Sequence, residues 1–217
     1  MVPTRDRSFG AEVLARFVPD VPVAWNLLDV TVRMIDDSGE VALRVQDVVN
    51  AAGVQIPILY RHFGSREGLV KAAHVQRMIT EIGDGIGGIA AEVRDSSSPM
   101  QFRRIIDRMI DNAISEELRD SRAKQVSILG ACYGRPDLTS AISSLEHSAR
   151  RALADALAPA QDRGWTDADL DRLVFAEWFY SQLLARFVVE IDDEVSSISG
   201  WDEIFRRTAL IELFGSD

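Results

Sequence analysis

The sequence of 217 residues predicts an all-α protein, with a small helical domain near its N-terminus and a larger helical domain after it. Apolar residues recur three or four positions apart in almost every segment, which is the spacing of a helix with one buried face. No segment has the alternation of apolar and polar residues that indicates a half-buried strand. We therefore expect an arm over residues 1–21, a small domain over 22–70 and a large domain over 71–217.

Two helices are expected before residue 40. A short one in the arm ends before Pro19 and has an apolar face of Phe9, Val13, Leu14 and Phe17. A longer one, which ends near residues 36–39, has an apolar face of Trp25, Leu28, Val32 and Ile35.

Two short helices joined by a tight turn come next. Val45, Val48 and Val49 have helical spacing, and Gly53 suits the left-handed turn that ends a short helix. Pro57 suits the first turn of the second helix, because that turn has no use for the N–H that proline lacks. The connection is only a few residues long, as in a helix-turn-helix.

The second short helix leads directly into a long one. Leu59 and Phe63 lie four positions apart and can face inward. Gly64 ends this helix, and Ser65 can cap the next one, over residues 66–82, with its side-chain oxygen.

The segment resembles the DNA-binding motif of the tetracycline-repressor-like (TetR) family of transcriptional regulators. The resemblance covers residues 42–71, extends more weakly back to Trp25, and rests on Ala52-Gly53-Val54, Leu59-Tyr60-Arg61-His62-Phe63 and Ser65-Arg66-Glu67-Gly68-Leu69. It implies an N-terminal helix-turn-helix three-helix DNA-binding domain and a C-terminal helical ligand-binding and dimerisation domain. The sequence departs from the family pattern at three positions. The family often has a capping Ser or Thr where Arg44 stands, a polar or basic residue near Gln55 and Ile56, and Ser or Thr at Ile58.

The motif supplies candidate contacts to double-stranded DNA. Gln46 and Gln55 can hydrogen-bond base edges, whereas isoleucine can only contact a thymine methyl group. Contacts to phosphates, which position a protein without reading sequence, are expected from Tyr60, His62, Arg66 and Lys71. For His62, a packed and hydrogen-bonded ring is the alternative. The full candidate set is Arg44, Gln46, Gln55, Ile56, Pro57, Ile58, Tyr60, Arg61, His62, Arg66 and Lys71. In the arm, Arg5 and Arg7 would suit a minor groove, with packing on the protein or a disordered tail as alternatives.

The net charge of −10 falls in the large domain. Residues 1–80 contain nine basic and nine acidic residues, whereas residues 81–217 contain 15 basic and 25 acidic residues. Between Arg44 and Arg77 there are five basic residues and two acidic ones. Screening confines repulsion from distant charge to about 8–10 Å, so phosphate contacts remain possible. We expect a modest, salt-sensitive affinity per subunit, with dimerisation needed for tight binding.

The composition excludes several other classes. Apolar residues make up 47% and charged residues 27%, as in an ordinary soluble protein. There is no apolar run of about 18 residues for a membrane helix, and charged residues interrupt any N-terminal signal peptide. Cys132 is the single cysteine, which excludes an intrachain disulfide and a cysteine-based zinc site. These features indicate the cytoplasm of a bacterium.

The large domain should be entirely helical. We expect helices over residues 99–113, 117–132, 136–157, 167–191 and 201–211. Residues 173–189 are apolar around most of the helix circumference, which indicates burial on two sides. The second side needs a partner, most simply a second copy. The resemblance implies the same: a homodimer built through a four-helix bundle of the last two helices, which would address a pseudo-palindromic operator.

Aromatic side chains in the large domain could line an apolar cavity with one polar anchor, although such residues also build ordinary cores. The candidates for binding a small-molecule effector are Phe102, Met109, Tyr133, His147, Phe175, Trp178 and Phe179. The resemblance implies that a small molecule, by default a largely apolar or aromatic one, releases the protein from DNA.

Three further patterns carry no chemistry. Residues 83–88 fit G-x-G-x-x-G, but no strand precedes them, so a broken helix end is the better interpretation. Ser121 and Lys124 fit S-x-x-K without partner motifs. Asp167, Asp169 and Asp171 lack the glycine and glutamate of a calcium loop and suit a helix N-terminus.

The sequence thus predicts a homodimeric DNA-binding regulator, most simply a repressor relieved by a small ligand, with no cofactor, no metal site and no catalytic residues. One alternative is a structural or protein-binding module without an inducer. Another is a helical-bundle enzyme or small-molecule carrier, although no nucleophile–base pair is visible.

Overall fold

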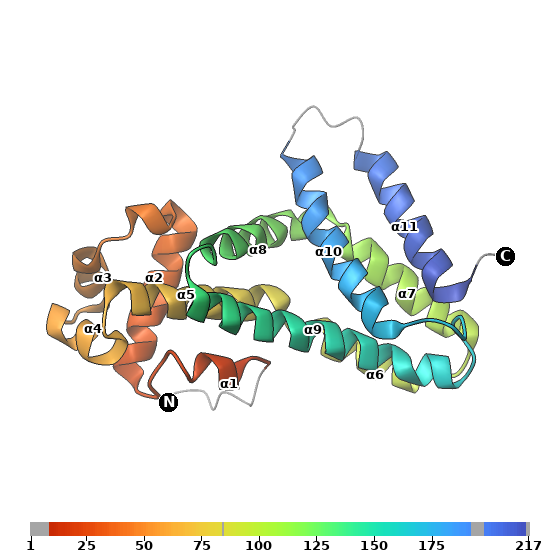
Figure 1. The fold of residues 1–217 in the computed structure, drawn as a ribbon, viewed down its shortest axis with the longest axis horizontal. Helices are drawn as coiled ribbons and strands as arrows, with labels where there is room; N and C mark the ends of the chain where they lie inside the picture. The colour runs from red at the N-terminus through yellow and green to blue at the C-terminus, as the bar shows by residue number, and fades with distance from the viewer. Residues whose placement is uncertain (1–8, 84, 192–197, 216–217) are drawn as a thin grey trace. The chain divides into compact units, whose positions relative to one another are not determined.

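The computed structural model describes residues 9–83, 85–191 and 198–215. The described residues are 81% helical and contain no strand, which confirms the predicted all-α class. The helices are α1 Ala11–Leu14, α2 Pro22–Ser38, α3 Val45–Ala52, α4 Ile56–Phe63, α5 Arg66–Ile82, α6 Gly85–Asp95, α7 Pro99–Ala113, α8 Arg119–Ala131, α9 Pro136–Asp162, α10 Arg172–Glu190 and α11 Ile198–Phe214 (Figure 1). Two 3₁₀ turns, η1 Glu40–Ala42 and η2 Glu116–Leu118, precede α3 and α8. Among the described helices, none has the length and apolar character needed to cross a membrane.

The chain forms two compact units that do not follow its linear order. The first unit combines Met1–Glu81 with Ile128–Leu145, and the second combines Ile82–Ser127 with Glu146–Asp217. The end of α8 and the start of α9 therefore belong with the N-terminal helices. The domain boundary predicted after residue 70 differs from this division, and Arg5 and Arg7 of the predicted arm lie outside the described residues.

Helices α2, α3 and α4 pack together as the core of the first unit. Leu28, Val48 and Leu59 are fully buried, and complete burial of such a side chain stabilises the fold by about 1.5–3 kcal/mol. Gly53 has φ 67°, and the N–H of Val54 donates to the carbonyl of Val49 at 3.0 Å. The predicted left-handed turn between α3 and α4 is therefore confirmed.

The connection between α4 and α5 is equally specific. Ser65 Oγ accepts a hydrogen bond from the N–H of Gly68 at 3.0 Å, so the predicted cap on α5 is confirmed. A Cβ atom on Gly68 would stand 2.0 Å from the carbonyl oxygen of Phe63. Only glycine lets the backbones of α4 and α5 approach this closely.

The second unit has its own aromatic core. Helices α10 and α11 lie side by side and run in opposite directions (Figure 1). Phe205 of α11 stacks on Trp178 of α10, with ring centroids 5.7 Å apart, and on Trp201, at 5.4 Å. Phe102 of α7 is fully buried and lies edge-on to Phe214, with ring centroids 5.8 Å apart.

Several helices of the large domain differ from their predicted bounds, and α11 spans Ile198–Phe214 rather than residues 201–211. Helix α10 begins at Arg172 and not at residue 167, because the Asp171 carboxylate accepts hydrogen bonds from the N–H groups of Leu173 and Val174 and caps the helix there. Helix α9 continues beyond the predicted residue 157, through Pro159, to Asp162. A proline inside a helix removes one backbone hydrogen bond and does not always end the helix.

The break predicted at residues 83–88 is present. Helix α5 ends at Ile82, Gly83 has φ 59°, and α6 begins at Gly85. A helix precedes this glycine-rich segment where a dinucleotide site would need a strand.

Candidate DNA-binding surface and effector pocket

Helix α4 turns one face into the core and presents the other to solvent. Leu59 and Phe63 are buried, whereas Gln55, Pro57 and Tyr60 are exposed. Arg61 is also exposed, and Ile56, Ile58 and His62 are half-buried. Leu59 and Phe63 of α4 therefore contribute to packing, and Ile56 and Ile58 do so in part. The accessible surface of α4 is formed by Gln55, Pro57, Tyr60 and Arg61.

Helix α3 adds further polar groups beside α4. Gln46 is exposed, and its amide donates to Asn50 Oδ1 at 2.9 Å, one turn further along the helix. Arg44 occupies the N-cap position of α3, makes no side-chain cap and is exposed. Asn26 of α2 donates to the carbonyl of Ala52 at 2.9 Å and ties the end of α3 to the domain.

Arg66 has a structural role that the sequence did not indicate. Its NH2 donates to the carbonyl of Glu40 at 2.8 Å, and its Nε donates to the carbonyl of Leu43 at 3.2 Å. The guanidinium thereby fixes the backbone on both sides of η1. Two of the guanidinium nitrogens of Arg66 are therefore engaged by backbone carbonyls, and its contact with DNA stays a prediction.

Lys71 is also engaged within the protein. Its Nζ forms an ion pair with Asp137 Oδ2 at 3.2 Å, and only about a fifth of its side chain is exposed. Among the predicted basic contacts, Arg44 and Arg61 therefore remain the accessible ones. The part of the chain that the structure describes shows no hydrogen bond for His62, and its ring is half-buried.

A cluster of charged side chains surrounds Glu40, just before the motif. Glu40 accepts hydrogen bonds from His74 Nε2 at 2.9 Å and from Arg135 NH1 at 2.9 Å, and it also pairs with Arg135 NH2. The Arg135 guanidinium is the main reason that the pKa of Glu40 falls from 4.5 to about 2. Residues that lie 95 positions apart are joined here, a pairing for which no local sequence pattern exists.

His74 is the buried member of this cluster. Its Nδ1 accepts from Arg77 NH1 at 3.2 Å, and Arg77 Nε pairs with Asp36 at 2.8 Å. An arginine can only donate, so Nδ1 carries the lone pair and the proton sits on Nε2, which donates to Glu40. Burial lowers the pKa of His74 and favours this neutral form. The sequence offered one hint, a histidine on the apolar face of residues 66–82.

The predicted effector residues divide between core and surface. Phe102, Met109, Phe175 and Phe179 are buried in the core of the second unit, and Trp178 packs partly buried against it. Tyr133 belongs to the first unit and is 95% exposed. His147 is exposed and accepts from Arg151 Nε at 2.7 Å. Neither residue belongs to the buried core of the second unit, and their role as polar anchors stays a prediction.

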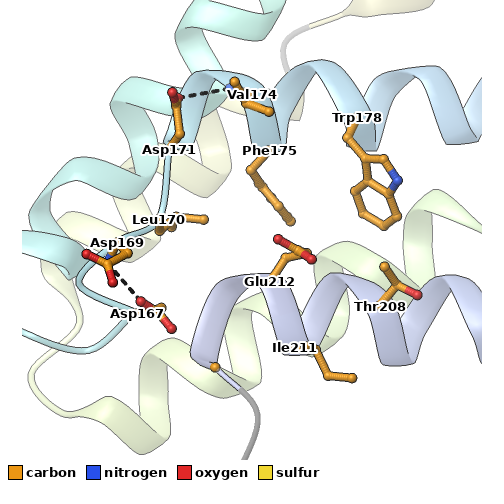
Figure 2. A pocket seen from close by; sticks show the side chains of 11 residues that line it. Asp167, Asp169, Leu170, Asp171, Val174, Phe175, Trp178, Thr208, Ile211 and Glu212 are labelled. Atoms are coloured by element: carbon orange, nitrogen blue, oxygen red, sulfur yellow. Dashed lines mark hydrogen bonds between the residues drawn. The ribbon is translucent and has the colours of Figure 1, made fainter.

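A pocket of about 570 Å³ opens between the start of α10 and the end of α11. Phe175 and Trp178 point from α10 toward α11, and Glu212 points back toward α10 (Figure 2). The preceding loop contributes Leu170 and the carboxylates of Asp167, Asp169 and Asp171. The pocket therefore combines an aromatic wall with an acidic rim.

The opposite end of the α10–α11 pair exposes large apolar side chains. Val188 is 70% exposed, Ile191 65% and Ile204 57%. These three residues are called here the exposed apolar face, because no other described part of the chain covers most of their surface.

One family model matches part of the chain. The model for bacterial regulatory proteins of the tetR family matches residues 27–73. A search of curated protein sequences finds no match.

Similar solved structures share the fold at low identity. A transcriptional regulator of the TetR family from Mesorhizobium loti has 13% identity and a TM-score of 0.66, covering 90% of this chain and 100% of its own. A regulator from Saccharomonospora viridis in complex with choline has 14% identity and a TM-score of 0.63, covering 87% of this chain and 96% of its own. The SmeT–triclosan complex has 16% identity and a TM-score of 0.59, covering 88% and 91%. Residues 27–73 therefore match the DNA-binding helix-turn-helix domain of the tetR family of bacterial regulatory proteins, and the chain as a whole shares its fold with solved regulators of that family.

Proposed function

We propose that this protein is a homodimeric transcriptional repressor of the bacterial cytoplasm that binds a pseudo-palindromic operator and leaves it when a small molecule binds. One observation carries the proposal. The motif presents Gln46, Gln55, Tyr60 and Arg61 to solvent, while Leu59 and Phe63 are buried and Ile56 and Ile58 are half-buried. Amides can read base edges, and a guanidinium or a hydroxyl can hold phosphates.

The accessible cations of the motif are few. Arg44 and Arg61 are exposed, whereas Arg66 and Lys71 are held by groups of the protein itself. Each phosphate contact adds to the salt dependence of binding. Few contacts per subunit make two subunits necessary for a tight complex, and two motifs related by a two-fold axis recognise a pseudo-palindrome.

The exposed apolar face supports the dimer. Val188, Ile191 and Ile204 are large aliphatic side chains that water surrounds in the single chain. Pairing α10 and α11 with the same helices of a second copy would bury them in a four-helix bundle, and burial of apolar area is what stabilises such an interface.

The pocket between α10 and α11 is our candidate effector site. Phe175 and Trp178 offer apolar contact, while the carboxylates at the rim favour a ligand that also carries positive charge. Two proteins of the same fold are described as complexes with choline and with triclosan, which supports ligand binding by this class of helical domain without naming the ligand here.

Selection from a random pool of DNA duplexes tests the proposal. The full-length protein should enrich a sequence with two-fold symmetry, and its affinity for that sequence should fall steeply between 50 and 200 mM salt, as for proteins with several phosphate contacts. Failure to enrich any sequence, or salt-independent binding, would contradict DNA recognition.

Native mass spectrometry and tryptophan fluorescence of the purified protein test the effector site. We expect mass spectrometry to detect a bound cationic, partly apolar compound, either co-purified or added. This compound should quench the fluorescence of Trp178 and weaken the DNA complex. The quench should disappear in Trp178→Phe and persist in Trp25→Phe, because Trp25 lies in the first unit. A quench that survives Trp178→Phe would place the ligand elsewhere.

A further inference from the structure

Arg135 joins the turn between α8 and α9 to the segment that leads into the helix-turn-helix. Its NH1 donates to Glu40 Oε2 at 2.9 Å, its NH2 pairs with Glu40 Oε1, and its Nε lies 3.0 Å from Glu67 Oε1. An arginine can bind a carboxylate through two coplanar nitrogens, so this contact fixes the orientation of Glu40 relative to Arg135 as well as the distance between them.

Glu40 is well placed to set the start of α3. It lies in η1, whose backbone is held at both ends by hydrogen bonds from Arg66 to the carbonyls of Glu40 and Leu43. Arg44 follows at the N-cap of α3. The side chain of Glu40 supplies a further attachment of η1, and α3 begins five residues later, at Val45.

We propose that Arg135 is a positioning residue for the DNA-binding motif: by gripping Glu40 it fixes η1 and the first turn of α3, so DNA affinity depends on a side chain outside the motif. The proposal rests on the proposed DNA-binding function. Helices α8 and α9, which flank Arg135, continue along the chain into residues of the second unit.

The other charges of the cluster cannot replace Arg135. The guanidinium of Arg77 already donates hydrogen bonds to Asp36 and His74, and His74 donates only a neutral N–H to Glu40. Without Arg135, the Glu40 carboxylate would keep only the hydrogen bond from neutral His74, and water would solvate its other oxygen. It is about one-fifth exposed, so water can reach it and η1 would be less constrained.

The same turn provides a matched control. Asp137, in the first turn of α9, pairs with Lys71 of α5, but its side chain is 78% exposed. An exposed ion pair contributes little. Asp137→Asn therefore removes a nearby charge pair, between α9 and α5, without touching Glu40.

The experiment compares Arg135→Gln, Arg135→Lys and Asp137→Asn with the wild-type protein. DNA affinity is measured on the selected duplex over a range of salt concentrations, and amide hydrogen exchange is measured over residues 40–52. Arg135→Gln should bind about tenfold more weakly, within the usual range of coupling between sites, with an unchanged salt slope and faster exchange in residues 40–52. Arg135→Lys should recover part of both effects, and Asp137→Asn should show neither.

Two results would overturn the proposal. One is unchanged exchange over residues 40–52 in Arg135→Gln. The other is a salt slope that falls by about one per subunit, which would make Arg135 a direct phosphate contact. If Arg135→Gln does not fold, Glu40→Gln weakens the same grip with a side chain of equal size, and the same outcomes apply. If the wild-type protein selects no DNA, the proposed function fails, while the exchange measurement still decides whether Arg135 holds η1.

Discussion

Arg77 donates a hydrogen bond from NH1 to Nδ1 of His74 at 3.2 Å, and this contact fixes the histidine in its neutral form. A proton on Nδ1 would point at a guanidinium. The pKa of His74 is accordingly lowered from 6.5, mainly by burial and further by the charges of Arg77 and Arg135, against the opposing effect of Glu40.

This arrangement predicts a loss of stability in mild acid. A base with a lowered pKa binds fewer protons in the folded state than in the unfolded state, so its contribution is complete above pH 6.5 and is lost as pH falls through the folded pKa. Urea unfolding between pH 8 and pH 5 should show this decline. His74→Gln, whose amide can donate to Glu40 and accept from Arg77, should lack it. Glu40, with a pKa of about 2, loses its contribution in a separate window, from pH 4.5 downward. Equal pH dependence in both proteins would contradict the assignment.

Gly68→Ala should destabilise the first unit. The new Cβ would meet the Phe63 carbonyl oxygen at 2.0 Å, and such overpacking costs about 1–3 kcal/mol. Gly130→Ala is the matched control, because a Cβ on this helical glycine of the same unit meets nothing within 4 Å. We expect a neutral or slightly stabilising effect there. Chemical denaturation measures both, and equal effects would argue against the close approach of α4 and α5.

Glu190→Gln should strongly destabilise the second unit. The carboxylate is 1% exposed and pairs with Arg122 and Arg186, both of which are also buried. Breaking a buried ion pair on one side costs about 3–5 kcal/mol, because it leaves a buried charge without compensation. Glu116→Gln removes an exposed pair with Arg119 of the same unit and should cost less than about 1 kcal/mol. Similar free energies of unfolding for the two variants would show that the buried cluster contributes little.

Val188→Glu should yield a monomer without unfolding the chain. A charge on the exposed apolar face opposes burial in a dimer interface. Met100→Glu, on α7, changes a side chain of similar exposure, 64% against 70%, and should leave the dimer intact. Sedimentation velocity distinguishes these outcomes. A dimer in both variants would show that Val188 does not lie in the dimer interface.

The sequence predicted the elements far better than the contacts among charged side chains. The turn at Gly53, the cap at Ser65 and the break after Ile82 follow from local rules of backbone geometry, and the structure contains all three. The start of α10 was missed, since three aspartates compete for the cap and the structure uses the last one.

Long-range pairing explains the remaining differences. Arg66 was predicted to contact phosphate, and its engagement within the protein was not foreseen. Its partners are backbone carbonyls, which no side-chain pattern in the sequence reveals. Glu40 and Arg135 meet across 95 positions. Tyr133 has helical spacing with apolar neighbours, yet it lies on the surface of the first unit. Hydrophobic periodicity identifies the buried face of a helix and does not identify which helix covers it.

The salt dependence of DNA binding by Arg61→Gln and Arg104→Gln tests the central claim most directly. Both arginines are exposed, one on α4 of the motif and one on α7 of the second unit. If α4 contacts DNA, the slope of log affinity against log salt should become shallower by about 0.9 per subunit in Arg61→Gln and stay unchanged in Arg104→Gln. Identical slopes for Arg61→Gln and the wild-type protein, or a larger change in Arg104→Gln, would contradict this account of the DNA-binding surface.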